Sequence, residues 1–108
     1  LPAMTAAGFG RVINIASRAV ATPAGRFIAY TVAKAGVITL TQALAQEVKG
    51  RGITVNAVLP GTMDTPANRA AMPGADRSGW VSTDTVAGVV GYLASDEAGG
   101  VSGAAIPV

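Results

Sequence analysis

Short runs of consecutive apolar residues alternate along the chain with longer stretches in which apolar residues recur every three or four positions. The short runs, rich in β-branched residues, are typical of buried parallel strands, and the longer stretches are typical of helices that cover a sheet. The predicted strands are residues 11–16, 53–58 and 104–107, and the predicted helices are residues 1–7, 28–49 and 82–94. Asn14 interrupts the first run, and we expect it to bond a neighbouring backbone group. This order predicts an α/β fold with three parallel strands joined by right-handed crossovers.

The longest predicted helix, residues 28–49, should pack one face on the sheet. The apolar residues at helical spacing that make up this expected face are Ala33, Val37, Leu40, Leu44 and Val48. The apolar region 27–48 approaches the ~20 residues that a membrane-spanning helix needs. Because this region also contains Lys34 and Glu47, a buried helix in a packed α/β domain is the better interpretation, and we expect no membrane association.

Hydroxyl, proline and glycine residues mark the ends of the predicted strands. Ser17 follows the first strand, at the carboxyl edge where open α/β sheets bind ligands. Its position alone also fits a turn serine that bonds its own backbone. Pro60 and Gly61 end the second strand, since proline lacks the donor that a central strand needs. Thr65, followed by Pro66, is typical of a helix N-cap with proline at the first helical position.

Composition excludes several classes of function. The chain has 108 residues, half of them hydrophobic and 13% charged, as expected for one core-rich domain rather than a disordered segment. The net charge is +2, but the eight basic residues are scattered, so no nucleic-acid surface is expected. Cysteine and histidine are absent, which excludes disulfides, the common zinc sites and Ser-His or Cys-His catalysis within the chain. We therefore expect no metal site.

Tyr30 and Lys34 form the most informative pair of side chains. Residues four apart lie on one face of a helix, so the phenol and the ammonium should project side by side. At ~5 Å and an effective dielectric constant of ~20, their attraction would stabilise a phenolate by roughly 3 kcal/mol. Such a phenol can serve as a general acid or base. Alone, the same spacing also fits an ordinary solvated helix face.

Three motifs in a fixed order point to a family. They are Gly10-Arg-Val-Ile-Asn-Ile-Ala-Ser17, Tyr30-Thr-Val-Ala-Lys34 and Gly52-Ile-Thr-Val-Asn-Ala-Val-Leu-Pro-Gly61, with Thr65 after the last. In this order and spacing the chain resembles the second half of a short-chain dehydrogenase/reductase. The resemblance implies the later half of a doubly wound, Rossmann-type parallel sheet, so that residues 1–108 are the C-terminal catalytic part of one domain. No glycine-rich dinucleotide-binding turn precedes Leu1, so we expect the N-terminal half to belong to a longer protein.

The resemblance also implies a mechanism. Hydride would move between a nicotinamide, NADP or NAD, and a small carbonyl or alcohol substrate. Tyr30 would transfer the proton, and Ser17 would hold the substrate oxygen. Lys34 would assist Tyr30 and bond the nicotinamide ribose, so both side chains also count as cofactor contacts.

The segment after the second strand would meet the nicotinamide. By resemblance it contributes Pro60, Gly61, the backbone around Met63 and the hydroxyl of Thr65, which would bond the carboxamide. Residues 65–80 would form a mobile flap over the substrate. This flap is similar to the corresponding segment of dihydropteridine reductase, although the pterin enzyme lacks the serine that Ser17 supplies.

The resemblance leaves alternatives and extends to assembly. A pterin reductase is one alternative, and a catalytically inert fragment that serves only in binding is another. Nucleotide-sugar epimerases share the Tyr-x-x-x-Lys motif, but the Pro60-Gly61 segment favours simple reductases. The helix 28–49 usually contributes to a dimer interface in the family, so a homo-oligomer is expected. We expect a cytoplasmic location.

Overall fold

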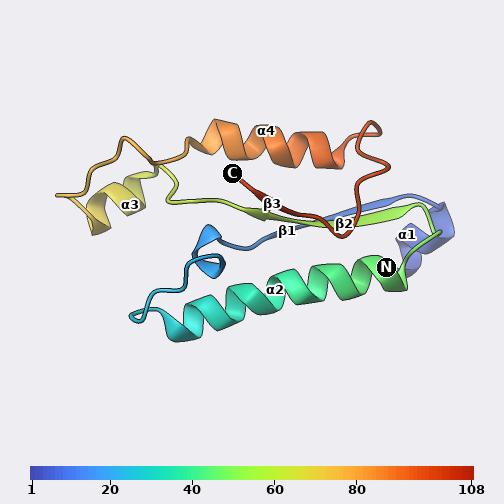
Figure 1. Cartoon of the computed structure of the whole chain (residues 1–108). Helices are drawn as coiled ribbons and strands as arrows, with labels where there is room; N and C mark the ends of the chain where they lie inside the picture. Colours follow the sequence, from blue (N-terminus) through green and yellow to red (C-terminus); the bar gives the residue numbers. More distant parts are fainter.

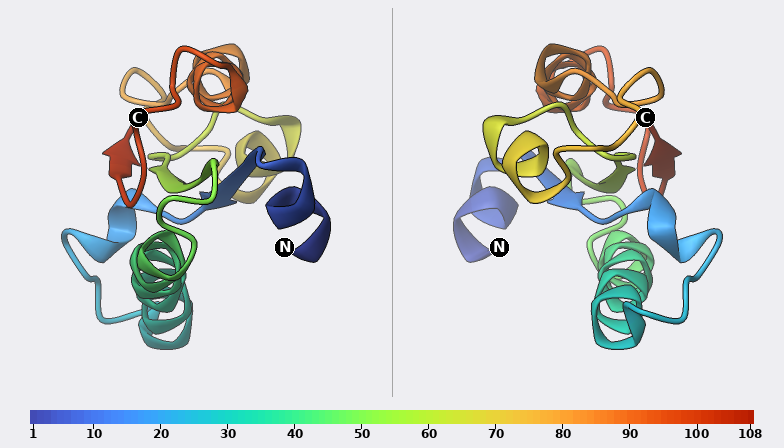
Figure 2. Two further views of the ribbon diagram at one scale, coloured as in Figure 1. Left: turned by 90° about the vertical axis from the view of Figure 1, so that its right-hand side faces the viewer. Right: turned by 90° about the vertical axis from the view of Figure 1, so that its left-hand side faces the viewer.

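The computed structural model describes residues 1–108 as a three-stranded parallel sheet with helices on both faces. The helices are α1 (Pro2–Ala7), α2 (Ile28–Glu47), α3 (Pro66–Ala71) and α4 (Thr83–Ala94), with a 3-10 turn η1 (Arg18–Val20), and the strands are β1 (Gly10–Ile15), β2 (Ile53–Leu59) and β3 (Ala105–Pro107). α2 lies along one face of the sheet and α4 along the other (Figure 1). The end-on views show α1 on the same side of the sheet as α2 (Figure 2). The predicted α/β class and parallel strands are confirmed.

β2 is the central strand, and all seven of its residues are buried. It pairs in parallel with β1 over residues 10–15 and with β3 at its carboxyl end. Its alternate side chains enter apolar clusters on the two faces of the sheet, as the twofold repeat of a strand requires. Val55 packs with Ala45 and Val48 beneath α2, and Val58 packs with Leu93 of α4.

The face of α2 that contacts the sheet differs from the predicted one. Ala33 and Leu40 were expected to be buried but are exposed, Leu40 by 58%. The buried residues of the helix are instead Thr31, Thr41 and Ala45. The expected contacts of Val37, Leu44 and Val48 with the core are present. The apolar pattern alone therefore predicted a contact face of α2 that is rotated about the helix axis relative to the observed face.

Hydrogen bonds explain why a threonine replaces a leucine in this contact. The Thr41 hydroxyl donates to the Val37 carbonyl, at 2.8 Å, and accepts from the Asn14 side chain of β1, at 2.9 Å. A buried hydroxyl with both bonds is well tolerated in a core. Asn14 therefore bonds a side chain of α2, and the predicted bond to a neighbouring backbone group was wrong.

By length and composition α2 could cross a membrane, with a mean hydropathy of 1.3. In this structure it packs on β2 and covers one face of the sheet, but only three of its 20 residues are buried, so the helix is less buried than predicted. Its outward side carries a row of small and apolar residues that nothing in the chain covers. The exposed members of this row are Ala29, Val32, Ala33, Gly36, Leu40 and Ala43.

Asn56 ties β2 to the segment that leads into β3. Its side chain is fully buried, donates to the Val101 carbonyl at 2.8 Å and accepts from the Ala104 backbone N–H at 3.0 Å. The Val101 carbonyl and the Ala104 N–H precede β3, which begins at Ala105, and the Asn56 side chain supplies their hydrogen-bond partners.

Replacing Gly52 should destabilise the protein far more than replacing Gly50. Both have a positive φ, 73° and 80°, which costs any other residue about 1–2 kcal/mol. An added Cβ at Gly52 would also clash with the Gly8 carbonyl, whereas one at Gly50 meets open space. We expect urea unfolding of the full-length protein to lose about 1 kcal/mol for Gly50→Ala and at least about 3 kcal/mol for Gly52→Ala. Equal losses would contradict the close approach.

Asn56→Ala should cost about 2–5 kcal/mol of unfolding free energy, because it empties a fully buried position and leaves the partly buried Val101 carbonyl and Ala104 N–H without partners. Asn14→Ala is the matched control. It should cost only about 1 kcal/mol, since Thr41 keeps its bond to the Val37 carbonyl. Denaturant unfolding of both variants measures the difference, and an equal or larger loss for Asn14→Ala would refute this ranking.

Candidate active site

A cavity of about 660 Å³ opens at the carboxyl ends of β1 and β2. In open α/β sheets this edge is where ligands bind. The segment after β1, the start of α2 and the segment after β2 form its walls. The residues that line it are Ile15, Ala16, Ser17, Arg18, Ala19, Thr22, Ala24, Phe27, Tyr30, Thr31, Lys34, Pro60, Gly61, Thr62, Met63, Asn68 and Met72. Six of the seven site residues expected from the sequence are among them, and Thr65 is not.

Ser17 lies where β1 gives way to η1. It is 9% exposed, and its Oγ accepts the Ala19 backbone N–H at 3.1 Å, so it caps the 3-10 turn. The turn role considered for this serine is therefore present. Because the oxygen acts as the acceptor in that bond, the hydroxyl hydrogen is still available to donate toward the cavity.

Tyr30 and Lys34 reach the same cavity from one face of α2, as their spacing predicts. The Lys34 ammonium donates to the Ile15 carbonyl at the end of β1, at 3.0 Å. Its nitrogen lies 5.8 Å from the centroid of the Tyr30 ring. Tyr30 is 49% exposed, so its phenol is accessible to a small molecule in the cavity. The lysine is thus anchored by the sheet and holds its charge beside the phenol.

The segment after β2 is held in place by backbone bonds. The Arg18 N–H donates to the Pro60 carbonyl at 3.1 Å, and the Gly61 N–H donates to the Val108 carbonyl at 3.0 Å. Met63 forms a parallel β-bridge with Val81, which closes the segment 64–80 into a loop. These bonds fix Pro60, Gly61 and Met63 beside the Ser17 turn.

Thr65 caps a helix and does not line the cavity. Its hydroxyl accepts the Asn68 N–H at 3.1 Å and caps α3, which begins with Pro66, as the local sequence predicted. The Asn68 side chain in turn donates to the Met63 carbonyl at 2.8 Å and lines the cavity. The carbonyl of Met63 is therefore occupied by Asn68, a residue that sequence reasoning missed.

An ion pair stiffens the start of this loop. Arg69 donates from Nε and Nη2 to the two carboxylate oxygens of Asp64, at 2.6 and 2.7 Å. These hydrogen bonds hold the pKa of Asp64 below its usual value and raise the pKa of Arg69. In the same loop, bonds from Ser78 lower the pKa of Asp76. The loop is thus organised by its own polar contacts, and Trp80 at its end is half-buried.

Several lining residues were not predicted as site residues. Two of them, Arg18 and Thr31, are the direct neighbours of Ser17 and Tyr30, and adjacency to a site residue is a signal that could have found them. The Thr31 hydroxyl is buried and has no hydrogen-bond partner within the chain. Phe27 and Met72 supply apolar surface at the mouth of the cavity, where both are exposed.

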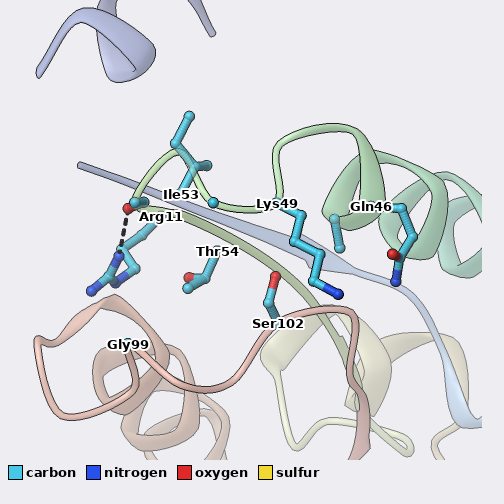
Figure 3. Close-up of a pocket in the computed structure, with 10 residues that line it drawn as sticks. Arg11, Gln46, Lys49, Ile53, Thr54, Gly99 and Ser102 are labelled. Atoms are coloured by element: carbon cyan, nitrogen blue, oxygen red, sulfur yellow. Dashed lines mark hydrogen bonds between the residues drawn. The ribbon is translucent and has the colours of Figure 1, made fainter. Parts of the chain in front are cut away.

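A second cavity of about 590 Å³ lies at the opposite end of the sheet (Figure 3). Arg11 and Lys49 reach it from different sides, with Thr54 and Ser102 between them. Arg11 bonds three backbone carbonyls, those of Ser95, Gly10 and Gly52, at 3.2, 2.9 and 3.4 Å. The guanidinium therefore joins the end of α4 to the start of β2, which is a structural role. No group of His, Cys, Asp or Glu side chains in the chain could hold a metal ion.

Comparison with known proteins identifies the family. The model of a family described as enoyl-(acyl carrier protein) reductase matches residues 1–108. A 3-oxoacyl-[acyl-carrier-protein] reductase of Pseudomonas aeruginosa is 44% identical over 117 residues, covering 100% of this chain and 47% of the relative.

Solved structures agree. A Burkholderia thailandensis oxidoreductase of the short-chain dehydrogenase/reductase family superposes with a TM-score of 0.88 at 30% identity, covering 99% of this chain and 46% of that one. A Beutenbergia cavernae protein solved with NADP bound at low occupancy has a TM-score of 0.88 at 34% identity, covering 98% and 47%. The chain thus spans about half the length of the proteins it matches. It belongs to the short-chain dehydrogenase/reductase family.

Proposed function

We propose that the protein containing this chain is an NAD(P)-dependent oxidoreductase that interconverts a small carbonyl compound and its alcohol. The observation that carries the proposal is the meeting of Ser17, Tyr30 and Lys34 with the Pro60-Gly61 turn around one cavity. The relatives are oxidoreductases of the same family, and one similar structure holds NADP. Because the chain spans about half of its relatives, the proposal concerns the longer protein expected from the sequence.

The lining of the cavity fits the nicotinamide end of such a cofactor. Lys34 has three ammonium donors, of which the Ile15 carbonyl uses one, so two are available to ribose hydroxyls. Pro60 and Met63 offer an apolar wall for a flat ring, and Gly61 brings no side chain to fill the space. When bound, the nicotinamide supplies or accepts the hydride.

The chain's own residues would manage the proton and the charge on the substrate oxygen. In the reductive direction the Tyr30 hydroxyl donates its proton as the carbonyl oxygen becomes an alkoxide. The Ser17 hydroxyl donates a hydrogen bond to the same oxygen, since the bond from the Ala19 N–H uses one lone pair of the Ser17 oxygen and leaves its hydrogen free. The Lys34 ammonium, held on the Ile15 carbonyl, stabilises negative charge on the phenol oxygen during the transfer.

The remaining expectations follow from this proposal. The cofactor is NADP or NAD, and the choice depends on residues that would belong to the first half of the domain. The 3-oxoacyl thioesters are the first substrates to examine, because the Pseudomonas relative is a 3-oxoacyl-carrier-protein reductase. The similarity of residues 65–80 to dihydropteridine reductase stays a prediction, so quinonoid dihydropterin belongs in the same panel. We propose a cytoplasmic location, in keeping with a small soluble substrate.

The exposed row on α2 supports a homo-oligomer. Val32 and Leu40 are 66% and 58% exposed, and the small residues between them would let a second helix approach closely. A self-complementary face of this kind suits a twofold dimer. The proposed dimer therefore uses α2 from both subunits.

Tyr30→Phe should lower the rate of NADPH or NADH oxidation by the full-length protein at least about 100-fold, since the variant has no hydroxyl to transfer the proton. The panel is a simple ketone, a 3-oxoacyl thioester and quinonoid dihydropterin. Tyr92→Phe is the matched control, because Tyr92 lies on α4 outside the cavity, and it should retain its activity. If Tyr30→Phe kept its turnover, the catalytic assignment would fail and a binding role would replace it.

Gly36→Glu should convert the oligomer to a monomer, because it adds charge in the middle of the exposed row of α2 while meeting open space within its own chain. Gly25→Glu, which also meets open space but lies in the loop before α2, should leave the oligomer intact. Sedimentation velocity of the two full-length variants distinguishes the states. An unchanged sedimentation coefficient for Gly36→Glu would exclude α2 as the interface.

A further inference from the structure

Arg18 is a cation held directly beside the proposed reaction centre. It follows Ser17, and its backbone N–H bonds the Pro60 carbonyl at 3.1 Å. Its side chain lines the cavity and passes close to the Pro60-Gly61 turn, since a Cβ added at Gly61 would lie 3.6 Å from the Arg18 Cδ. The base of this side chain is thus fixed between the proposed substrate oxygen site and the proposed nicotinamide wall.

The guanidinium of Arg18 has no partner within the chain. No hydrogen bond or ion pair engages it, and the Asp64–Arg69 pair is the salt bridge that the chain forms. No carboxylate lines the cavity. Lys34 is the other charged residue of the lining, and it is anchored on the Ile15 carbonyl. An unpaired guanidinium with five donors is therefore exposed to whatever occupies the cavity.

The surroundings reinforce the positive charge. Segments 16–34 and 60–80, which form the cavity and its flap, carry five basic and two acidic residues. Of the two acids, Asp64 is paired with Arg69, and Asp76 bonds the Ser78 backbone within the loop. Apart from Arg18 and Lys34, the cavity lining is apolar or neutral. An excess of positive charge around a cleft attracts anions and raises their local concentration.

We propose that Arg18 forms an anion subsite, which binds a carboxylate or phosphate that the substrate carries close to its carbonyl group. This inference rests on the proposed function of the same cavity, and it narrows the substrate class to short oxo acids or phosphorylated ketones and the corresponding alcohols. A guanidinium binds a planar carboxylate or a phosphate through two parallel hydrogen bonds. Because the base of the Arg18 side chain lies between Ser17 and Gly61, we expect the anionic group of the substrate to lie close to the reacting carbon.

Two matched pairs of substrates test the subsite in the full-length protein. They are 3-oxobutanoate against its methyl ester, and dihydroxyacetone phosphate against dihydroxyacetone, so each pair differs in the charged group near the ketone. The wild type should prefer the charged member of at least one pair about tenfold or more in kcat/KM. The preferred pair identifies the anion as carboxylate or phosphate.

Arg18→Gln should lower kcat/KM for the preferred anion about tenfold or more, chiefly through KM, and change that of its neutral partner less than about twofold. Arg18→Lys should recover part of the loss, because it restores the charge without the fork of donors. Arg51→Gln, an exposed arginine in the turn before β2 and outside the cavity, is the control and should change neither substrate.

The outcomes separate the subsite from the proposed function. The anion subsite is refuted if the wild type has equal kcat/KM values for both members of each pair. It is also refuted if Arg18→Gln lowers kcat/KM equally for both members of a pair. In either case, turnover that depends on Tyr30 would still support the oxidoreductase proposal. Calorimetric titration with 3-hydroxybutanoate and with glycerol 3-phosphate needs no turnover. A dissociation constant raised about tenfold in Arg18→Gln for one of them supports the subsite, and unchanged binding or no binding of either anion overturns it.

Discussion

The hydrogen-bonded ladder between β1 and β2 continues past the end of both strands, and the candidate site depends on that extension. The Ala16 N–H bonds the Val58 carbonyl, and two residues later the Arg18 N–H bonds the Pro60 carbonyl. Ser17 lies between these two bonds. The turn that carries the serine is thereby fixed against the turn that follows β2 by backbone hydrogen bonds. Backbone pairing therefore sets the position of Ser17, the proposed hydrogen-bond donor to the substrate oxygen.

Polar contacts act together with apolar ones to set the position of α2 along the sheet. Lys34 bonds the last carbonyl of β1, and Thr41 bonds Asn14 two turns further along the helix. Two directional hydrogen bonds to successive residues of one strand tolerate little displacement of the helix along the sheet. Since Tyr30 lies one turn before Lys34, the same bonds fix where its phenol enters the cavity.

Much of this arrangement could be predicted from the sequence, but not all of it. The β-branched runs predicted the three strands to within about a residue, and Thr65 with Pro66 predicted the start of α3. Both predictions succeeded because they rest on local sequence signals. The packing face of α2 was predicted wrongly, since a bond between Thr41 and a distant strand outweighed the apolar character of Leu40. Arg18 has no periodic or capping signature. Its adjacency to Ser17 was a signal in the sequence, but its contact with the Pro60-Gly61 turn depends on the pairing of two strands.

The topology also governs how the site comes into being during folding. The ladder pairs Gly10 with Ile53 and Ala57 with Ala105, so its contacts join residues more than 40 positions apart. Closing such long loops lowers the entropy of the chain before the strand contacts contribute any stabilising free energy. Sheets with high contact order are therefore slow to fold. No locally folded intermediate can contain both the serine turn and the Pro60-Gly61 turn. The cavity therefore cannot form before β1 and β2 have paired, and recovery of ligand binding by the proposed active site during refolding would report on that pairing.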